Sequence, residues 1–531
     1  MSDFLLDIRN LHIAFPVEGG QKSVVKNFNL SLKAGEMHGI VGESGSGKSV
    51  SMLSVCKLVP QALYPEGEIL FKTENGEDID LLKTDQLQSI RGKQISYIFQ
   101  EPMTALNPLM TCGKQVAEAM IDANREHIIE LLEKVKLPDP LRIYHSYPHQ
   151  ISGGQRQRIM IAMAIANQPK LMIADEPTTA LDASVQHEVL QLIKEICQSE
   201  KMALVFISHD LQVVKNLTDQ LTVMYAGEVV EQGATAHIMQ HPRHPYTQAL
   251  MAIKPSFSQR GHFLPTLEKI LNQPDFIPSN WPEIKRMDER IMQVEDINKS
   301  FSGKPVLNHI QFEVNKGESL GIVGESGCGK STLAKILVKL HLPDAGQMLF
   351  EGKSIVDLGK RYRRQVQMVF QDPYSSLNPR ITAGETLTEP MKVHGLYGNA
   401  AERKSKAIAL LEAVGLSADH WDHYPHQFSG GQRQRLCIAR ALSVEPSVII
   451  CDESVSALDV SVQAQILNLL KDLQQRFGLT YLFISHDLHV VTYFCDRVMV
   501  LNRGSISTLQ TTEKLIQEPG DEYTQKLLSY L

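Results

Sequence analysis

Short apolar runs that end in a glycine or a carboxylate recur along this chain. The runs Met37–Val41 and Leu320–Val323 each lead into a glycine-rich segment that is followed by residues compatible with a helix. Two further segments, Lys170–Glu176 and Ser447–Glu453, are mostly apolar and end in two acidic residues. Such runs suit buried parallel strands whose carboxyl ends open onto a ligand crevice. The pattern therefore predicts an α/β fold.

The two glycine-rich segments, Gly42–Ser49 (GESGSGKS) and Gly324–Ser331 (GESGCGKS), have the pattern of phosphate-binding loops. Glycines let the backbone point its N–H groups at phosphate oxygens, and the helix that follows offers its N-terminus. Glycine-rich turns are common, but the full pattern between a strand and a helix, found twice, favours nucleotide binding. We expect Lys48 and Lys330 to reach the β- and γ-phosphates. The glycines of the two loops are Gly42, Gly45, Gly47, Gly324, Gly327 and Gly329.

The same ordered set of motifs occurs twice in the chain. Lys48 and Lys330 are 282 residues apart, and the acidic segments and all later motifs are 277 residues apart. A period of this length is far outside the range of solenoid repeats, so it indicates two whole domains in tandem. We predict a first domain at residues 1–253, a linker at 254–289 and a second domain at 290–531. The linker has balanced charges and five prolines, which favour an extended connector: Pro255, Pro265, Pro274, Pro278 and Pro282.

Composition agrees with an ordinary globular protein of more than one domain. The chain has 531 residues, of which 43% are hydrophobic and 21% charged, and its formal charge is −7. This charge gives no reason to expect nucleic acid as a partner. No apolar run is long enough to cross a bilayer and the start lacks the pattern of a signal peptide, so we expect the chain to stay in the cytosol.

The seven cysteines are odd in number and show no CxxC pairing, which favours reduced structural thiols. Cys328 lies inside the second glycine-rich loop, where the first loop has Ser46. It is either a tolerated small side chain or a thiol that is modified beside the nucleotide.

The acidic pairs predict a cation site and a catalytic base. Adjacent residues of a strand point to opposite faces, so the two carboxylates of a pair cannot have the same role. We expect Asp175 and Asp452 to bind Mg²⁺ together with the loop hydroxyls, and Glu176 and Glu453 to deprotonate the attacking water. The hydroxyls belong to Ser49 and Ser331. An exposed acidic strand end is the alternative, and the nearby phosphate-binding loop disfavours it.

Two histidines follow apolar strands in matching segments, FISHDL at 206–211 and again at 483–488. A lone histidine at such a place is more often structural. Because His209 and His486 recur in register with the other motifs, we expect each of them to contact the γ-phosphate.

The order of these motifs resembles the ATP-binding cassette (ABC) ATPases over nearly the whole chain. The segments SGGQ at 152–155 and 429–432 resemble the signature that distinguishes this family from other P-loop enzymes. The resemblance implies two α/β nucleotide-binding domains, each with a RecA-like core and a helical subdomain. It also implies that the two domains pair within the chain, so that the signature of one closes over ATP on the loop of the other.

The family pattern assigns further residues. It implies that Gln100 and Gln371 contact Mg²⁺ and the attacking water. Phe15 and Phe301 stand where the family places an aromatic residue against adenine; they either stack on the base or pack in the core. The signature residues assigned to nucleotide are Ser152, Gly154, Gln155, Ser429, Gly431 and Gln432.

Departures from the family pattern are mild. Ile151 and Phe428 precede the signatures where leucine is usual, and Ser454 stands where the first half has Pro177. Since no lysine, glutamate, signature serine or histidine is lost, we expect two sites that hydrolyse ATP.

The glutamine segments narrow the resemblance. Residues 100–108 and 371–379 are similar to the glutamine loops of oligopeptide, dipeptide and nickel importer ATPases, as are YPHQ at 147–150 and 424–427. The element HPYT at 244–247, echoed by Glu522-Tyr523-Thr524, is another mark of that group. The chain resembles the fused form of these ATPases, like those that serve glutathione or microcin C-like peptide importers.

This resemblance implies an ATPase subunit, with ATP and Mg²⁺, that powers uptake of peptides or related solutes. It would lie on the cytoplasmic face of the inner membrane, bound to two separate membrane-spanning permease subunits. An extracytoplasmic solute-binding protein would deliver the solute. The transported solute is not indicated by the sequence, because specificity in this family lies mainly in the other subunits.

Two other classes share part of this architecture. Soluble tandem ABC proteins that act on ribosomes typically have a long, basic, helical linker, whereas this linker is neutral and rich in proline. DNA-repair ABC ATPases interrupt their cassettes with cysteine clusters that bind zinc, and this sequence has none. The sequence therefore favours the importer ATPase.

Overall fold

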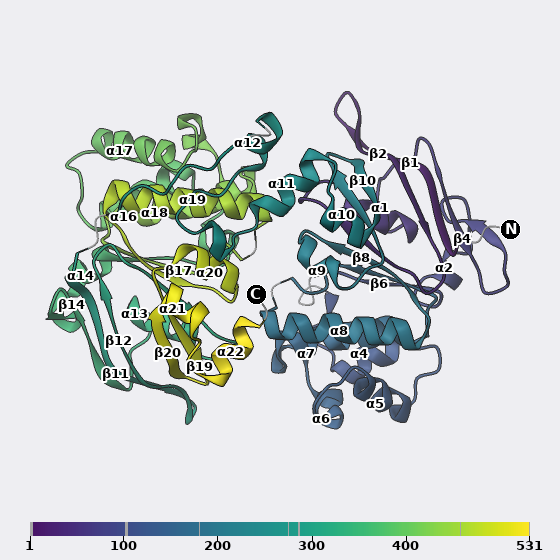
Figure 1. The fold of residues 1–531 in the computed structure, drawn as a ribbon, viewed down its shortest axis with the longest axis horizontal. Helices are drawn as coiled ribbons and strands as arrows, with labels where there is room; N and C mark the ends of the chain where they lie inside the picture. Colours follow the sequence, from purple (N-terminus) through teal and green to yellow (C-terminus); the bar gives the residue numbers. More distant parts are fainter. Residues whose placement is uncertain are drawn as a thin grey trace. The chain divides into compact units, whose positions relative to one another are not determined.

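The computed structural model describes residues 4–100, 105–179, 181–273, 276–284, 287–456 and 458–529 (Figure 1). Four residues of the first glutamine segment, Glu101–Thr104, lie outside this part, as do Pro274, Asp275, Lys285 and Arg286 of the predicted linker. The chain forms two compact units. One comprises residues 1–181, 185–252 and 267–274, and the other comprises 182–184, 253–266 and 275–531.

The first unit contains two sheets and a group of helices. A six-stranded sheet has the order β10-β9-β3-β8-β7-β6, in which only β10 is antiparallel to its neighbour, and a four-stranded antiparallel sheet has the order β2-β1-β4-β5. The strands are β1 (Leu6–Val17), β2 (Gly20–Leu32), β3 (Met37–Val41), β4 (Glu68–Lys72), β5 (Asp78–Asp80), β6 (Ile95–Ile98), β7 (Leu171–Asp175), β8 (Ala203–Ser208), β9 (Gln220–Tyr225) and β10 (Glu228–Ala234).

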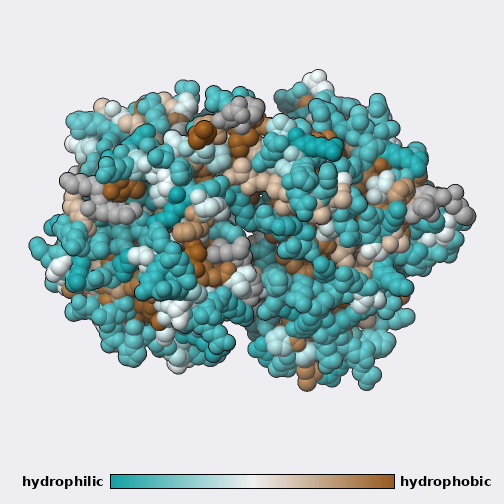
Figure 2. Space-filling view, viewed as in Figure 1, coloured by the Kyte–Doolittle hydropathy of each residue, from teal (hydrophilic) through white to brown (hydrophobic). Residues whose placement is uncertain are grey.

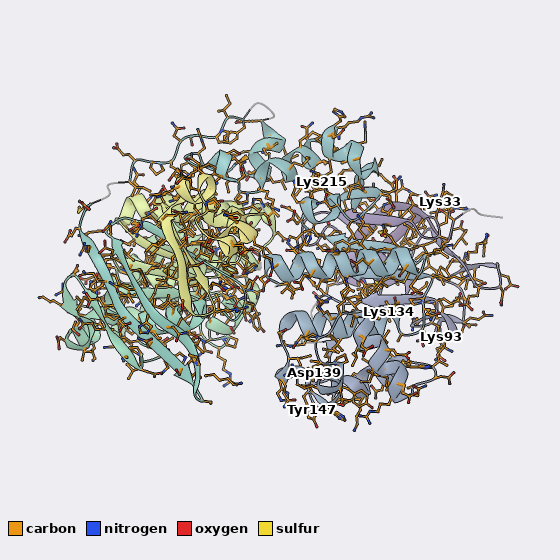
Figure 3. All side chains as sticks on the ribbon, turned by 60° about the horizontal axis from the view of Figure 1, so that its bottom comes forward. Lys33, Lys93, Lys134, Asp139, Tyr147 and Lys215 are labelled. Atoms are coloured by element: carbon orange, nitrogen blue, oxygen red, sulfur yellow. The ribbon has the colours of Figure 1, made fainter. Side chains whose placement is uncertain are left out.

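The helices of the first unit cover the six-stranded sheet and form a separate helical group. Figure 1 shows α4, α5 and α6 gathered beside α7, away from β1 and β2. The helices are α1 (Lys48–Val55), α2 (Leu87–Ile90), α4 (Cys112–Ala119), α5 (Arg125–Lys134), α6 (Pro140–His145), η1 (Pro148–Gln150), α7 (Gly153–Ile165), α8 (Ala183–Ser199), α9 (Leu211–Lys215), α10 (Thr235–Gln240), α11 (Pro245–Ile253) and α12 (Leu267–Asn272). Asp139 and Tyr147, labelled in Figure 3, mark the helical group.

The second unit repeats this plan. Its sheets have the orders β16-β17-β18-β13-β19-β20 and β12-β11-β14-β15. The strands are β11 (Arg290–Phe301), β12 (Lys304–Asn315), β13 (Ser319–Val323), β14 (Ala345–Phe350), β15 (Lys353–Ser354), β16 (Val366–Val369), β17 (Val448–Asp452), β18 (Thr480–Ile484), β19 (Arg497–Asn502) and β20 (Ser505–Thr511). The helices are η2 (Phe257–Gln259), α13 (Lys330–Leu337), α14 (Ile355–Gln365), α15 (Pro373–Ser376), α16 (Ala383–Val393), α17 (Ala400–Ala413), η3 (Ala418–Asp422), η4 (Pro425–Gln427), α18 (Gly430–Leu442), α19 (Val460–Phe477), α20 (Leu488–Phe494), α21 (Thr512–Gln517) and α22 (Glu522–Leu528).

The central strands are buried along their whole length, as the apolar runs predict. Every residue of β3, β7 and β8 is buried in the first unit, and so is every residue of β13, β17 and β18 in the second. Both faces of these sheets are covered, which is the arrangement that parallel strands require. The predicted α/β fold is confirmed, and the two sheet sets agree with two nucleotide-binding domains.

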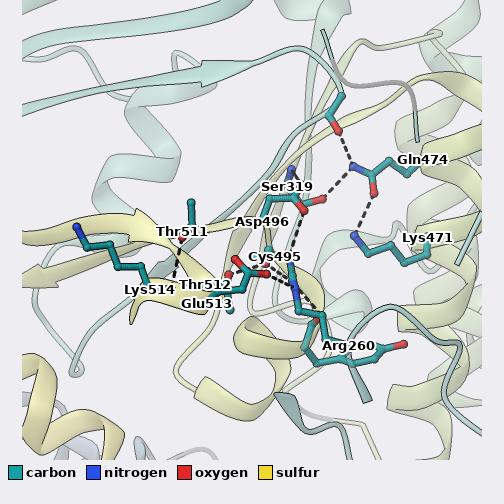
Figure 4. A network of polar contacts seen from close by, with 12 residues as sticks. Arg260, Ser319, Lys471, Gln474, Cys495, Asp496, Thr511, Thr512, Glu513 and Lys514 are labelled. Carbon is teal, nitrogen blue, oxygen red and sulfur yellow. Dashed lines mark hydrogen bonds and ion pairs between the residues drawn. The ribbon is translucent and has the colours of Figure 1, made fainter. Parts of the chain in front are cut away.

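A part of the segment between the repeats packs against the second unit. Arg260 donates hydrogen bonds to the backbone oxygens of Tyr493 (3.3 Å) and Cys495, and its guanidinium pairs with Asp496 (Figure 4). Trp281 donates from its indole N–H to the Tyr493 hydroxyl at 3.2 Å. These contacts fix residues around 260 and 281 on the helix α20.

The surface is mostly hydrophilic, with scattered apolar patches in the face shown in Figure 2. No helix in the described ranges combines the length and the apolar character that crossing a membrane requires. The lysines labelled in Figure 3 belong to the polar surface of the first unit.

Candidate active site

Each glycine-rich loop joins a buried strand to a helix, β3 to α1 in the first half and β13 to α13 in the second. A Cβ atom on Gly42 would lie 2.2 Å from the carbonyl oxygen of Met224, so no larger residue fits there. Gly47 precedes α1 with a φ of 98°, a conformation that favours glycine. Gly324 and Gly329 meet the same restrictions in the second half. The loops therefore have the local structure that a phosphate cradle needs.

The loop lysines are buried and point back into their own loops. Nζ of Lys48 donates to the carbonyl oxygens of Gly42 at 2.7 Å and Glu43 at 2.8 Å. Lys330 makes the equivalent bonds to Gly324 at 2.6 Å and Glu325 at 3.0 Å. A buried ammonium group held at the loop provides the positive charge that phosphate oxygens require.

The first acidic residue of each pair lies at the carboxyl end of its strand, beside the loop. In the first half, Ser49 donates to Oδ1 of Asp175 at 3.0 Å, and the hydroxyl of Tyr97 donates to Oδ2 at 2.8 Å. Asp452 is equally buried, but within the described part of the chain its Oδ1 has no hydrogen-bond partner. The structure thus brings two of the predicted cation ligands of the first half, Ser49 and Asp175, together, and it leaves an unsatisfied buried carboxylate oxygen in the second.

The second acidic residue of each pair contacts the predicted glutamine and histidine. Gln100 donates to Oε2 of Glu176 at 3.1 Å, and Nδ1 of His209 lies 3.1 Å from the same oxygen. In the second half Gln371 donates to Oε2 of Glu453 at 2.7 Å, and Nδ1 of His486 is 3.4 Å away. Residues that are far apart in the sequence therefore converge on one carboxylate in each half.

Burial and neighbouring charges shift the pKa values of the two carboxylates of a pair in opposite directions. Burial, with the nearby charge of Glu453, raises the pKa of Asp452 to about 6, and burial also raises the pKa of Asp175. Burial alone would raise the pKa of Glu453, but the hydrogen bond and charge of His486 outweigh it and lower that pKa. The pKa of Glu176 is lowered in the same way by His209. The histidine therefore keeps the glutamate ionised, as a base must be.

The signature segments begin helices α7 and α18. Ser152 caps α7: its hydroxyl accepts from the backbone N–H of Gln155 at 3.3 Å, and the Gln155 side chain accepts from the Ser152 N–H at 3.0 Å. Ser429 and Gln432 form the same reciprocal cap. A Cβ atom on Gly154 would lie 2.5 Å from Cγ1 of Val185, and Gly431 is equally crowded by Val462. The second glycine of each signature therefore has no room for a side chain.

The remaining predicted residues have less distinctive surroundings. Phe15 packs partly buried against the core of its sheet. Phe301 is 43% exposed, with the His341 ring at 5.6 Å. Cys328 is buried with Sγ 3.9 Å from Nζ of Lys330, and burial raises the pKa of its thiol, which disfavours the reactive thiolate. All seven cysteines are free and buried.

Two tyrosines hold the loops and were not assigned this role from the sequence. The hydroxyl of Tyr246 accepts from the backbone N–H of Glu43 at 2.9 Å, and Tyr523 accepts from the N–H of Glu325 at 3.1 Å. Their recurrence 277 residues apart was the available signal. Tyr97 was missed as well. Burial and the charge of Asp175 raise its pKa, so its hydroxyl stays protonated as a donor.

Comparison with known proteins places the chain in a family. Residues 25–179 and 307–456 match the family described as ABC transporter, and residues 230–279 match the oligopeptide/dipeptide transporter C-terminal region. The chain belongs to the ABC transporter family, in which its two matched segments are ATPase domains. It is therefore a tandem ATP-binding protein and an ATPase of the oligopeptide/dipeptide group, as its motifs predicted.

Its relatives include proteins named glutathione import ATP-binding protein GsiA. The one from Salmonella typhimurium (strain LT2) is 44% identical over 99% of this chain and 89% of the relative. The ones from Escherichia coli (strain K12) and Pectobacterium atrosepticum are 42% and 41% identical over the same shares. Among solved structures, cbiO1 from Clostridium perfringens, part of the ABC transporter complex cbiONQ, is 28% identical, with a TM-score of 0.40, and covers 44% of this chain and 92% of that one.

Proposed function

We propose that this chain is the ATP-hydrolysing subunit of an importer for glutathione or similar small peptides. It works on the cytoplasmic face of the inner membrane, bound to two separate permease subunits. An extracytoplasmic binding protein delivers the solute to them. The observation that carries this proposal is the likeness, across 99% of the chain, to proteins named for glutathione import.

The geometry of each half supports the proposed chemistry. Mg²⁺ prefers oxygen ligands and keeps several waters, so it fits a hydroxyl and a carboxylate such as Ser49 and Asp175. The unsatisfied Oδ1 of Asp452 fits the same role in the second half. When bound, Mg²⁺ neutralises charge on the β- and γ-phosphates. Lys48 and Lys330 bind the same phosphates from the loops.

The glutamates then activate water. Glu176, kept ionised by His209, accepts the proton of the attacking water, and Gln100 orients that water through the same carboxylate. Glu453, His486 and Gln371 repeat these roles. In our proposal, Ser152 and Gly154 close over nucleotide on the second loop, and Ser429 and Gly431 over nucleotide on the first. The 1–253, 254–289 and 290–531 division gives one loop and one signature to each domain.

Energy reaches the permeases through the helical groups. In the first, several apolar side chains are exposed rather than packed, including Leu109 at 85%, Ile121 at 62% and Leu141 at 51%. In the second, Tyr374 and Val393 are exposed in the same way. Exposed apolar residues of this kind support docking of short permease helices. Binding of ATP between the halves favours their closed arrangement, and hydrolysis lets them reopen.

Uptake of labelled solute in cells that lack this chain tests the proposal. The wild-type chain should restore uptake of radiolabelled glutathione, and the matched Lys48→Ala and Lys330→Ala double variant, expressed to the same level, should not. Detergent-solubilised membranes should yield the tagged chain with two multi-span proteins. Ribosomal proteins in their place, with unchanged glutathione uptake, would contradict the importer function.

A further inference from the structure

Strands β6 and β16 each lie beside the acidic strand of their half. At one matched position these two strands carry different residues. In the first half β6 pairs with β7 so that Tyr97 lies opposite Ile173, two residues before Asp175. In the second half β16 pairs with β17 so that Met368 lies opposite Ile450, two residues before Asp452. Tyr97 and Met368 therefore occupy the same place relative to the two aspartates.

This difference changes how the aspartates are held. Both oxygens of Asp175 accept a hydrogen bond, from the Ser49 hydroxyl at 3.0 Å and from the Tyr97 hydroxyl at 2.8 Å. Met368 is buried and has only a thioether, which cannot donate to a carboxylate. Oδ1 of Asp452, the atom that in Asp175 accepts from the loop serine, is also buried without a partner within the residues that the structure describes.

A carboxylate that is held at both oxygens has little rotational freedom to lose when it binds a cation. The Tyr97 hydroxyl occupies Oδ2 of Asp175. Because Oδ1 has two lone pairs, it can accept from Ser49 and still face the cation. Asp452 lacks this support and must be ordered by the cation itself. Pre-organised ligands bind with less loss of entropy, so the first half should bind the cation more readily.

We propose that Tyr97 is a positioning residue that orients Asp175, and that the two nucleotide sites therefore differ in their requirement for Mg²⁺. This inference rests on the proposed role of Asp175 and Asp452 as cation ligands. The first site fills at lower Mg²⁺ concentration than the second. The two halves are thus unequal although both keep the loop lysine, the acidic pair, the signature serine and the histidine.

Binding of ATP to full-length chains with one working loop tests this inference. Lys330→Ala leaves the first site and Lys48→Ala leaves the second, and Glu176→Gln with Glu453→Gln prevents hydrolysis in both. The Mg²⁺ concentration that half-restores ATP binding after chelation should be roughly 5-fold lower for the first site, since one hydrogen bond is at stake. Binding measured in excess chelator should not differ.

Exchange of the two residues gives the sharper comparison. Tyr97→Phe and Tyr97→Met should raise the Mg²⁺ midpoint of the first site to that of the second, and Met368→Tyr should lower the midpoint of the second. Tyr64→Phe is the matched control, because its hydroxyl donates to Ser54 at 3.2 Å and does not contact Asp175.

Equal midpoints in the two single-site chains, or a first site that Tyr97→Phe leaves unchanged, would overturn the inference. A chain whose ATP binding ignores Mg²⁺ at both sites would instead contradict the proposed role of the two aspartates. The two failures are therefore distinguishable.

Discussion

Glu176 and Glu453 have backbone φ angles of 46° and 47°, in the left-handed region that residues with a side chain seldom adopt. Such a conformation costs on the order of 1–3 kcal/mol and persists only where neighbours enforce it. Here the N–H of each glutamate donates to a carbonyl of the next strand, Ile207 at 3.0 Å and Ile484 at 2.9 Å. In this conformation each carboxylate contacts the glutamine and the histidine of its own half.

Replacing these glutamates separates binding from hydrolysis. Glutamine keeps the size of the side chain and an acceptor oxygen, but it cannot take a proton from water. Glu453→Gln should lower turnover at its site by roughly 100-fold or more and leave ATP binding intact, so nucleotide is trapped. Glu176→Gln should act in the same way at the other site. Unchanged turnover in both variants, measured as phosphate release, would refute the assignment of the base.

A buried histidine makes the stability of the first unit depend on pH. His38 in β3 is 2% exposed, its Nε2 lies 2.8 Å from the Thr222 hydroxyl, and burial lowers its pKa to about 4. The unfolded chain takes up the proton near pH 6.5, so this stability is complete above pH 6.5 and is lost as the pH falls towards 4. By pH 5 the loss amounts to about 2 kcal/mol.

The second half supplies the control variant, because Leu320 stands at the matched position of β13. His38→Leu should lose about 2 kcal/mol less unfolding free energy than the wild type between pH 7.5 and pH 5. Urea unfolding of the first unit at both pH values measures this difference. Parallel pH profiles for the two chains would show that His38 is protonated while buried.

At the scale of elements, a helix beyond each core sheet is tied to the nucleotide loop. Tyr246 in α11 and Tyr523 in α22 accept from the N–H of Glu43 and Glu325. The carbonyls of Gly42 and Gly324, which belong to the same peptide groups as these N–H groups, accept from Lys48 and Lys330, so each peptide group is held on both sides. Helices α11 and α22 therefore limit the motion of the loops.

Removing one hydroxyl should loosen one loop. Tyr246→Phe keeps the buried ring but frees the N–H of Glu43, and a net loss of about 1 kcal/mol corresponds to roughly 5-fold weaker ATP binding at the first site. Tyr523→Phe should weaken only the second site. Tyr225→Phe is the control, since its ring lies 4.4 Å from that of Tyr246. An equal loss at both sites in either variant would contradict this local effect.

Arg260 holds the connecting segment on the second unit. Its guanidinium pairs with Asp496 at 3.3 Å and Glu513 at 3.0 Å, and only 15% of its side chain is exposed. Asp496 also accepts from the N–H of Ser319, at the start of the strand that leads to the second loop (Figure 4). The segment is therefore connected to β13 through one carboxylate.

Arg260→Ala leaves the largely buried carboxylate of Asp496 without this partner. We expect a loss of about 3 kcal/mol in the stability of the second unit and faster protease cleavage between residues 254 and 289. Arg361→Ala removes an exposed ion pair with Glu351 in the same unit and should cost less than about 1 kcal/mol. Limited proteolysis followed by mass spectrometry locates the cleavage. Cleavage at the wild-type rate in Arg260→Ala would show that other contacts, such as Trp281 on Tyr493, suffice.

What the sequence could predict depended on how local each feature is. The loops, the acidic strands and the capped signatures are contiguous motifs whose spacing fixes their chemistry, and the repeat doubled the evidence for each. The bond between Tyr97 and Asp175 joins residues 78 apart, and that between Arg260 and Asp496 joins residues 236 apart. Such contacts depend on which strands become neighbours in the sheet, and the spacing of residues along the chain does not predict this.

At the scale of the whole molecule, the chain consists of two compact units, each with its own core and its own phosphate-binding loop. Lys48 lies in the first unit and Lys330 in the second, and each donates hydrogen bonds to the backbone of its own loop. Nucleotide bound at one loop should therefore stabilise the unit that contains it. Mg-ADP suits the test, because it avoids turnover.

At about 100 times its dissociation constant, a ligand adds about 2.7 kcal/mol to the unfolding free energy of the unit that binds it. Mg-ADP should thus slow hydrogen exchange in peptides from both halves of the wild-type chain. Lys48→Ala should lose this protection in β3 and α1 and keep it in β13 and α13, and Lys330→Ala should show the reverse. Loss of protection in both halves of either variant would mean that the two loops bind nucleotide as one shared site, because independent units would each respond only to the lysine they contain.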